Sequence, residues 1–395
     1  MDLRRVAGTA GRTLLALTSA AALAATGVGW GLQQQVTTGL VTSNAVSAPP
    51  VEPGREFTVL LVGLDARTDA DGNPLPQPLL DALHAGPDEG QLHTDTMILV
   101  HVPASADERA VAVSIPRDSY VRLADGSGQH KINSAYDRAD LAAQKANPQV
   151  TGPALDKLGR EAGRAGLIKT VEQLTGVRVD HYAEINLAGF VELTDTLGGV
   201  PVCLNAAAHD DYSGVDLPAG YQTVSGPGAL AFVRQRHGLE GGDLDRIARQ
   251  QAFIAGLAQR FEATGTLTDP ALLSRLLDVA RRHVVIDAGW DIQQALSQVG
   301  RLTGADIEFR TIPTGRPDLR TPVDGVAVQI DPAAVRAFVQ EHFSGTIPTS
   351  AAGSGSPTAT PEPTPTGPAR TAAVGPAAAA TPTRVITAGG VPCVN

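Results

Sequence analysis

The chain has 395 residues, of which 43% are hydrophobic and 18% are charged, and its formal net charge at pH 7 is −10. A chain of this composition can bury a large core, which excludes wholesale disorder. The acidic balance argues against non-specific nucleic-acid binding, which needs a basic surface. The two cysteines, Cys203 and Cys393, are too few for a cysteine-rich zinc site or a disulfide framework.

The first segment with a structural signal is a charge-free stretch, Thr13 to Leu32, which follows a short segment with three arginines. A helix of that length, at about 1.5 Å per residue, spans roughly the 30 Å core of a bilayer. The positive flank predicts that residues 1–12 stay in the cytoplasm and that the body is exported. The alternative is a signal peptide cleaved near Ala22 to Ala24. We expect an uncleaved single-pass anchor in the cell membrane, with an extracytoplasmic body.

Strand and helix signals follow a polar linker over 33–55 and define an expected domain over 56–343. Short apolar runs predict strands at Phe57–Val62, Thr96–Val102, Ala110–Ile115, Ile307–Ile312 and Val326–Ile330. Helical periodicity and capping signals predict helices at Leu167–Leu174, Leu187–Leu197, Leu244–Ala263, Pro270–Val284, Asp291–Leu302 and Pro332–Phe343. Because the two types mix without strict alternation, we expect an α/β fold: a mixed central β-sheet flanked by helices on both faces.

The last segment, residues 344–395, is rich in Pro, Ala and Thr and carries few charges. It cannot bury a core of its own, so we expect it to be disordered or extended. In an exported protein such a tail either threads cell-wall polymer or serves as a plain linker.

Several common catalytic motifs are missing from the sequence. It holds no G-x-x-x-x-G-K-[ST] phosphate loop, no H-E-x-x-H and no G-x-S-x-G. The histidines show no metal-ligand spacing, and we interpret His209-Asp210-Asp211 as a solvated turn.

Two aspartates stand at the ends of the first two predicted strands. Asp65 follows the first strand, and Asp95 sits just before the second. If those strands are neighbours, both carboxylates lie at one end of the sheet. Two oxygen ligands with water commonly hold Mg²⁺, or Mn²⁺, beside a phosphate. The alternative is that both are capping residues in loops.

Basic side chains recur at similar positions. Arg246 and Gln250 are four residues apart on a predicted helix and so share a face. The further candidates are Arg117, Lys131, Arg234 and Arg236. Several arginines that converge on a pyrophosphate would neutralise it together with a divalent metal. The alternative is that each is an ordinary surface arginine.

Taken together, these motifs resemble the LytR-CpsA-Psr family. They occur in the family's order, at Phe57–Asp65, His93–Val100, Ser114–Asp118, Lys131–Asn133, Val179–Tyr182, Leu197–Val200, Val233–Arg236 and Gly242–Gln251. The Ala-, Gly- and Arg-rich composition resembles an actinomycete member. Each motif alone is weak, but the ordered set is specific.

The resemblance implies an anchored extracytoplasmic phosphotransferase. Such enzymes move a glycopolymer from a polyprenyl-pyrophosphate carrier to the muramic acid 6-hydroxyl of peptidoglycan, through a phosphodiester bond. In this interpretation Asp65 and Asp95 hold the metal, and both are catalytic together with Arg117 and Arg246. The implied pyrophosphate-binding residues are Arg117, Lys131, Arg234, Arg236, Arg246 and Gln250. The family fold also implies an apolar tunnel for the lipid, walled by helices such as Leu187–Leu197 and Leu244–Ala263. The implied partners are the glycopolymer on its polyprenyl-pyrophosphate carrier, peptidoglycan and the membrane. No nucleic acid is implied as a partner.

The sequence also departs from the family's pattern. His93 stands where an arginine is common, and the interval 68–92 is longer than expected. The segment 140–166 is enlarged as well. These departures leave the polymer and the acceptor open. Two other functions also stay open: a pyrophosphatase on the same donor, and a non-catalytic wall-binding or regulatory protein.

Both cysteines lie on the expected exported side, where disulfides persist. A bridge between Cys203 and Cys393 would pin the end of the chain to the domain. The alternative is a buried Cys203 and an unrelated tail thiol.

Overall fold

The structure is a computed structural model, and it describes residues 39–52, 54–86, 90, 92–105, 108–265, 269–290, 307–344, 386–387 and 390–395. The expected anchor over 13–32, the expected helix Asp291–Leu302 and most of the expected tail lie outside these residues. Within the described part of the chain, no helix combines the length and the hydropathy needed to cross a bilayer.

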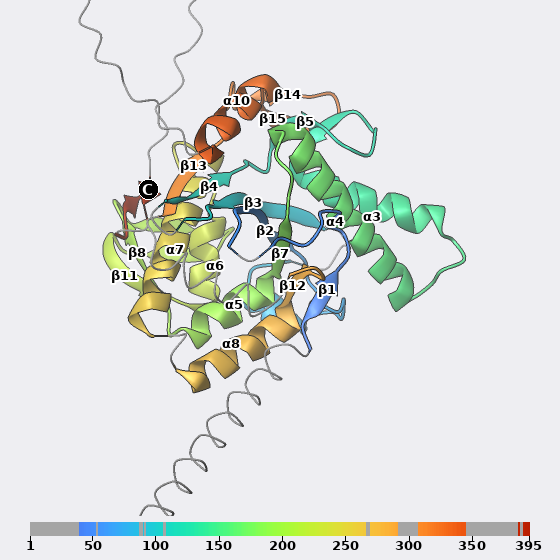
Figure 1. Ribbon diagram of the computed structural model, residues 1–395. Coiled ribbons are helices and arrows are strands. Elements are labelled where there is room, and N and C mark those ends of the chain that lie inside the picture. Colours follow the sequence, from blue (N-terminus) through green and yellow to red (C-terminus); the bar gives the residue numbers. More distant parts are fainter. Residues whose placement is uncertain are drawn as a thin grey trace, which may run out of the picture.

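An eight-stranded mixed sheet forms the centre of the molecule (Figure 1), in the order β1-β12-β7-β2-β3-β4-β13-β16. Its strands are β1 (Val41–Ser43), β12 (Val284–Asp287), β7 (His181–Asn186), β2 (Phe57–Asp65), β3 (His93–Val102), β4 (Ala110–Ser114), β13 (Ile307–Thr311) and β16 (Ile386–Thr387). Strand β2 pairs antiparallel with β3 and parallel with β7. The expected mixed sheet is confirmed.

Side chains of the central strands alternate between two hydrophobic cores, as the pleat of a strand requires. In β2, Val59 enters the first core, whereas Leu60 and Val62 enter the second. Both faces are apolar, which explains the continuous apolar run from Val59 to Val62. The central strands are therefore buried on both sides.

Helices cover both faces of the sheet, as expected. The first core receives side chains from α5 (Leu187–Thr196), α6 (Gly226–Arg234) and α7 (Asp243–Ala263). The second receives side chains from α3 (Ala135–Ala146), α4 (Pro153–Thr175) and α10 (Pro332–Phe343). Helix α8 (Pro270–His283) adds a smaller cluster beside α5.

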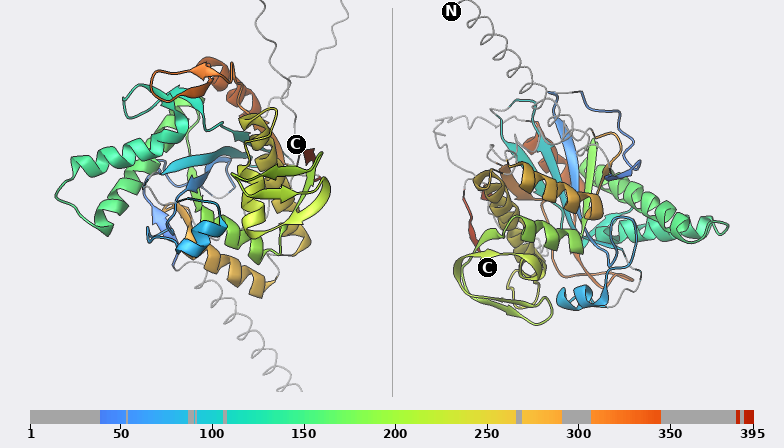
Figure 2. Two further views of the ribbon diagram at one scale, coloured as in Figure 1. Left: turned by 180° about the vertical axis from the view of Figure 1, so that it is seen from behind. Right: turned by 90° about the horizontal axis from the view of Figure 1, so that it is seen from below.

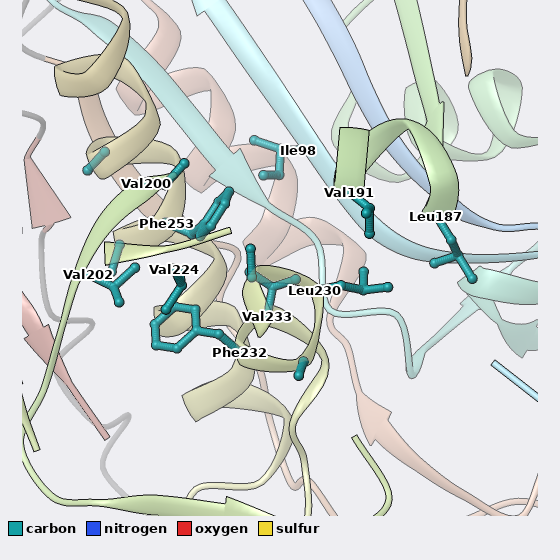
Figure 3. Close-up of a cluster of buried hydrophobic side chains, with 14 of the residues drawn as sticks. Ile98, Leu187, Val191, Val200, Val202, Val224, Leu230, Phe232, Val233 and Phe253 are labelled. Atoms are coloured by element: carbon teal, nitrogen blue, oxygen red, sulfur yellow. The ribbon is translucent and has the colours of Figure 1, made fainter. Parts of the chain in front are cut away.

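A small sheet closes the far side of the first core. It has the order β11-β8-β17, with β8 at Val200–Leu204, β11 at Gly220–Val224 and β17 at Cys393–Val394. Figure 3 shows Val200 and Val202 of β8 beside Phe232 and Phe253, from α6 and α7. This packing fixes α6 and α7 relative to each other.

Shorter elements connect these layers. A four-stranded sheet has the order β14-β15-β5-β6, and a two-stranded hairpin has the order β10-β9. Their bounds are β14 (Leu319–Arg320), β15 (Val326–Gln329), β5 (Ser119–Arg122), β6 (Gln129–Lys131), β9 (Ala208–Asp210) and β10 (Val215–Leu217). The remaining elements are α2 (Gln77–Ala82) and the 3-10 helix η1 (Ile132–Ser134).

The enlarged segment 140–166 belongs to a helical hairpin of α3 and α4 that projects from one side of the domain (Figures 1 and 2). Only the end of α4 was expected as a helix, at Leu167–Leu174. Gly163 lies against Tyr136 of α3, where a Cβ atom would come within 2.6 Å of the ring. Glycine has a low helix propensity, so the sequence alone does not indicate a helix at this position. The glycine is needed here because α3 and α4 pack closely.

Described strands outside the expected domain limits of 56–343 pair with strands inside them. Strand β1 lies in the expected linker and pairs with β12, while β16 and β17 lie in the expected tail and pair with β13 and β8. Strands of two or three residues carry no periodicity that a sequence pattern can reveal.

A disulfide joins Cys203 of β8 to Cys393 of β17, which are 190 residues apart in sequence. The bridge therefore holds a distant segment of the chain as an edge strand of the small sheet.

We expect titration of the unreduced, denatured protein to detect no free thiol, and to detect two after reduction. In the chain-entropy model, a loop of 190 residues makes the bridge worth about 5 kcal/mol. The double variant Cys203→Ala, Cys393→Ala should lower the free energy of unfolding by up to that amount, measured in urea. An unchanged unfolding midpoint would contradict this role, and a non-reducing peptide map checks that the pairing is within one chain.

Candidate active site

Asp65 and Asp95 lie at one end of the central sheet. Asp65 is the last residue of β2 and pairs with His93 of β3. Gly63 pairs with Thr96 but Leu64 pairs with Thr94, so Asp95 is the extra residue of a β-bulge. Asp95 therefore lies within β3. The sequence pattern had indicated a position just before the strand. Bulges change the direction of a side chain at the edge of a site.

The two carboxylates are close enough to affect each other. Burial raises the pKa of Asp65, and the negative charge of Asp95 raises it further. Arg67 partly compensates, with its Nη1 3.3 Å from Oδ1 of Asp65. Arg117, which follows β4, forms an ion pair with Asp95. The expected juxtaposition of the two aspartates is thus present, and each has an arginine partner.

A third carboxylate, Asp118, holds three of the basic side chains together. Its Oδ1 lies 3.2 Å from Nζ of Lys131 and 3.7 Å from Nε of Arg117, and its Oδ2 lies 3.3 Å from Nη2 of Arg236. Asp118 was not among the predicted site residues. The signal that could have found it is its position directly after Arg117, in a chain where acidic residues must balance a basic cluster.

Arg246 enters the same group of charges from the first turn of α7. It is buried and forms an ion pair with Asp243, another acid that was not predicted. Burial lowers the pKa of Arg246, and the charges of Asp95 and Arg117 also act on it. The carboxyl of Asp243 has its pKa raised, mainly by burial.

Arg234 and Gln250 complete the predicted set. Arg234, at the end of α6, donates a hydrogen bond of 3.0 Å to the carbonyl oxygen of Leu83, and its charge lowers the pKa of Asp65. Gln250 donates from Nε2 to the carbonyl oxygen of Val233 at 3.4 Å, so its amide contacts the backbone of α6. Arg117, Arg234 and Arg246 thus lie within electrostatic range of the two aspartates. Lys131 and Arg236 contact Asp118 beside Arg117, and Gln250 contacts the helix that ends in Arg234.

The donor set fits a divalent cation only in part. Carboxylate oxygens are suitable ligands for Mg²⁺ or Mn²⁺, and Oδ1 of Asp65 is buried without a hydrogen bond in the described structure. No group of three or more His, Cys, Asp or Glu side chains within the described ranges could hold a metal ion. A cation bound by Asp65 and Asp95 would therefore need further oxygens from a phosphate or from water.

The raised pKa of Asp65 predicts a pH-dependent cost to stability. Between the unfolded pKa, about 3.9, and the higher folded pKa, the folded state binds more protons, so stability falls as the pH rises. Asp65→Asn should therefore increase the free energy of unfolding at pH 7 and change it little below pH 4. Urea unfolding in the presence of a chelator measures both values. Equal stability of the variant and the wild type at pH 7 would contradict the burial of a charged Asp65.

Comparisons with known proteins identify the family of the chain. Residues 32–340 match the LytR_cpsA_psr family. The cell wall biosynthesis protein LcpA of Corynebacterium glutamicum is 45% identical over 308 residues, covering 75% of this chain and 57% of LcpA. The polyisoprenyl-teichoic acid–peptidoglycan teichoic acid transferase TagU of Oceanobacillus iheyensis is 31% identical over 203 residues, covering 51% of this chain and 56% of TagU.

The chain thus spans little more than half the length of either relative. Among solved structures, TagT bound to LI-WTA has a TM-score of 0.51 at 21% identity, over 77% of this chain and 96% of TagT. That likeness concerns the fold. The family match covers most of the chain, and it shows that the chain belongs to the LytR_cpsA_psr family.

Proposed function

We propose that this protein is a metal-dependent phosphotransferase that moves a glycopolymer from a polyprenyl-pyrophosphate carrier to peptidoglycan. Family membership supports the proposal, as do the names of two relatives: LcpA is a cell wall biosynthesis protein and TagU a teichoic acid transferase. The observation that supports the proposal most directly is a pair of buried arginine N–H groups. Nε of Arg117 and Nε of Arg246 lie buried beside the paired aspartates without a hydrogen bond in the described structure.

Those two N–H groups suit the oxygens of a pyrophosphate. A buried donor without a hydrogen bond costs free energy, which an anionic ligand would recover. Nε of Arg117 lies 3.7 Å from Oδ1 of Asp118, beyond hydrogen-bond distance. Arg117 and Arg246 come from separate parts of the chain and lie within electrostatic range of each other, so one anion could accept hydrogen bonds from both. Arg236 and Lys131 are held by Asp118 and can exchange that carboxylate for a phosphate oxygen. The charge of a pyrophosphate explains why so many cations gather here.

The proposed reaction needs no external energy source, because the pyrophosphate is already activated. The hydroxyl oxygen of the acceptor forms a bond to the phosphorus next to the glycopolymer, while its O–H bond breaks and the proton passes to water or to the departing phosphate. The bond from that phosphorus to the bridging oxygen breaks, and polyprenyl phosphate leaves. Arg117 and Arg246 are placed to stabilise the charge that develops on the phosphoryl oxygens. A divalent cation held by Asp65 and Asp95 would neutralise further charge on the phosphates.

We assign the lipid part of the proposed donor to the first hydrophobic core. Helices α5 and α7, expected to wall a tunnel, pack their apolar faces there (Figure 3). At its border, Phe190 of α5 is partly buried and its ring lies 5.0 Å from that of Phe253. We place the prenyl chain between these two helices, where each buried methylene would contribute about 0.8 kcal/mol. The anchor proposed over 13–32 would keep the site outside the cytoplasm and beside the bilayer.

The lipid assignment predicts a difference between two ligands. Farnesyl pyrophosphate should raise the melting temperature more than inorganic pyrophosphate does, since only the former buries a chain. Phe190→Ala should reduce this difference while leaving the effect of inorganic pyrophosphate intact. Equal shifts from both ligands in the wild type would count against a prenyl site.

The site assignment predicts loss of transfer in two variants. Asp95→Asn removes a proposed metal ligand, and Arg117→Lys replaces a planar fork by a point charge. Each should lower the rate by about a hundredfold or more. The full chain in detergent would be incubated with a lipid-pyrophosphate-linked saccharide and peptidoglycan fragments, with and without Mg²⁺, and the phosphodiester product detected by mass spectrometry.

Arg178→Lys is the matched control for Arg117→Lys, because Arg178 is exposed and pairs with Asp180, the residue before β7. It should keep wild-type activity. Normal turnover by both site variants would refute the assignment. Release of the saccharide phosphate without attachment to peptidoglycan would indicate a pyrophosphatase, and binding without any reaction would indicate a non-catalytic protein.

A further inference from the structure

Arg249 is buried on α7 with 1% of its surface exposed, and the proposed chemistry does not use it. Its Nε donates to the backbone oxygen of Asn395, and its Nη1 donates to Oε1 of Gln235 at 2.5 Å. Its guanidinium carbon also lies 5.2 Å from the centre of the Phe232 ring, within cation–π range. One side chain thus joins α7, the end of α6 and a segment far away in sequence.

Gln235 is the residue between two of the site arginines, Arg234 and Arg236. It is buried at the end of α6, accepts the hydrogen bond from Arg249 and donates from Nε2 to the carbonyl oxygen of His237 at 2.9 Å. Both ends of its amide are therefore engaged. The amide fixes the turn after α6, from which Arg234 and Arg236 reach their separate partners.

The acceptor for Nε of Arg249 comes from the segment 390–395. Cys393 and Val394 form β17 on β8, and the backbone N–H of Asn205 donates to the carbonyl oxygen of Val394 at 2.8 Å. The side chain of Asn205 also donates to Oδ1 of Asn395 at 2.9 Å. With the Cys203–Cys393 bridge, this segment is fixed covalently and by hydrogen bonds.

Loss of that acceptor would leave a cation without a partner inside the protein. Burial lowers the pKa of Arg249 to about 10, which still leaves it protonated at neutral pH. A buried charged donor without its acceptor costs more than a neutral one. The guanidinium would then move towards water and release Gln235.

We propose that Arg249 is a positioning residue of the active site, which links the docked strand β17 through Gln235 to the turn that carries Arg234 and Arg236. The inference rests on the proposed function. It also gives the Cys203–Cys393 disulfide a role in the geometry of the anion site, beyond its contribution to stability.

Arg249→Lys tests the link, because the single nitrogen of an ammonium group cannot occupy the positions of both Nε and Nη1. We expect the affinity for inorganic pyrophosphate, measured by calorimetry, to fall about tenfold or more, and the KM for the lipid donor to rise similarly. Gln235→Leu should have the same effect. The control is Arg260→Lys, on the same helix, because Arg260 donates to the carbonyl oxygens of Leu197 and Gly198, away from the site.

The control separates positioning from loss of stability. If Arg260→Lys lowers the melting temperature as much as Arg249→Lys but leaves pyrophosphate affinity unchanged, the positioning role stands. Unchanged affinity in Arg249→Lys would overturn it. A wild type that neither binds pyrophosphate nor transfers the saccharide would instead refute the proposed function.

A double-mutant cycle tests the connection to the disulfide. Cys393→Ser should weaken pyrophosphate binding, and its effect should not add to that of Arg249→Lys, since both break one chain of contacts. Additive losses would overturn the connection to β17. Normal binding by Cys393→Ser alone would overturn it as well.

Discussion

Several positively charged side chains lie buried close together at one end of the sheet, and each must be neutralised by a nearby carboxylate. The rest of this structure depends on that constraint. Arg117 and Arg246 lie with little exposure at one sheet end, next to carboxylates that are themselves desolvated. Repulsion among cations in such a place is tolerable only if acids alternate with them. The four aspartates supplying that balance come from β2, the bulge in β3, the turn after β4 and the start of α7. The fold must therefore bring four chain segments to one point.

Each of those segments is fixed by apolar packing on both sides of the sheet. The side chains of β2 alternate between two cores, so the strand cannot slide by one residue without placing its whole pattern on the wrong face. Asp65 is thereby fixed at the end of β2, and the bulge sets Asp95 relative to it. The charged site is costly to assemble, and the cores on either side supply the free energy that holds it.

Much of this arrangement could be predicted from the sequence, because long apolar runs identify strands such as β2 and long amphipathic stretches identify α7. Residue types at the ends of those elements indicated Asp65, Arg117 and Arg246. The remainder depends on contacts that no local pattern encodes. The bulge at Asp95 arises from pairing, and the helix around Gly163 from close packing against Tyr136.

Other parts of the site were missed for a different reason. Asp118 is a balancing acid whose importance appears only when Lys131 and Arg236 converge on it from elsewhere in the chain. Arg249 stands beside the predicted Gln250 and looks like one more arginine on a helix. Its two acceptors, Gln235 and Asn395, are 14 and 146 residues away, so only the tertiary structure identifies its partners.

The disulfide also changes how the chain after α10 is connected to the domain. Before the segment 345–385, α10 packs Val335 and Val339 into the second core, and after it Cys393 is bonded to Cys203. Both flanks of the segment are thus attached to the same domain, one by apolar packing and the other by a covalent bond. A protease that cuts anywhere within the segment would produce two polypeptides that still migrate as one molecule until a reductant separates them.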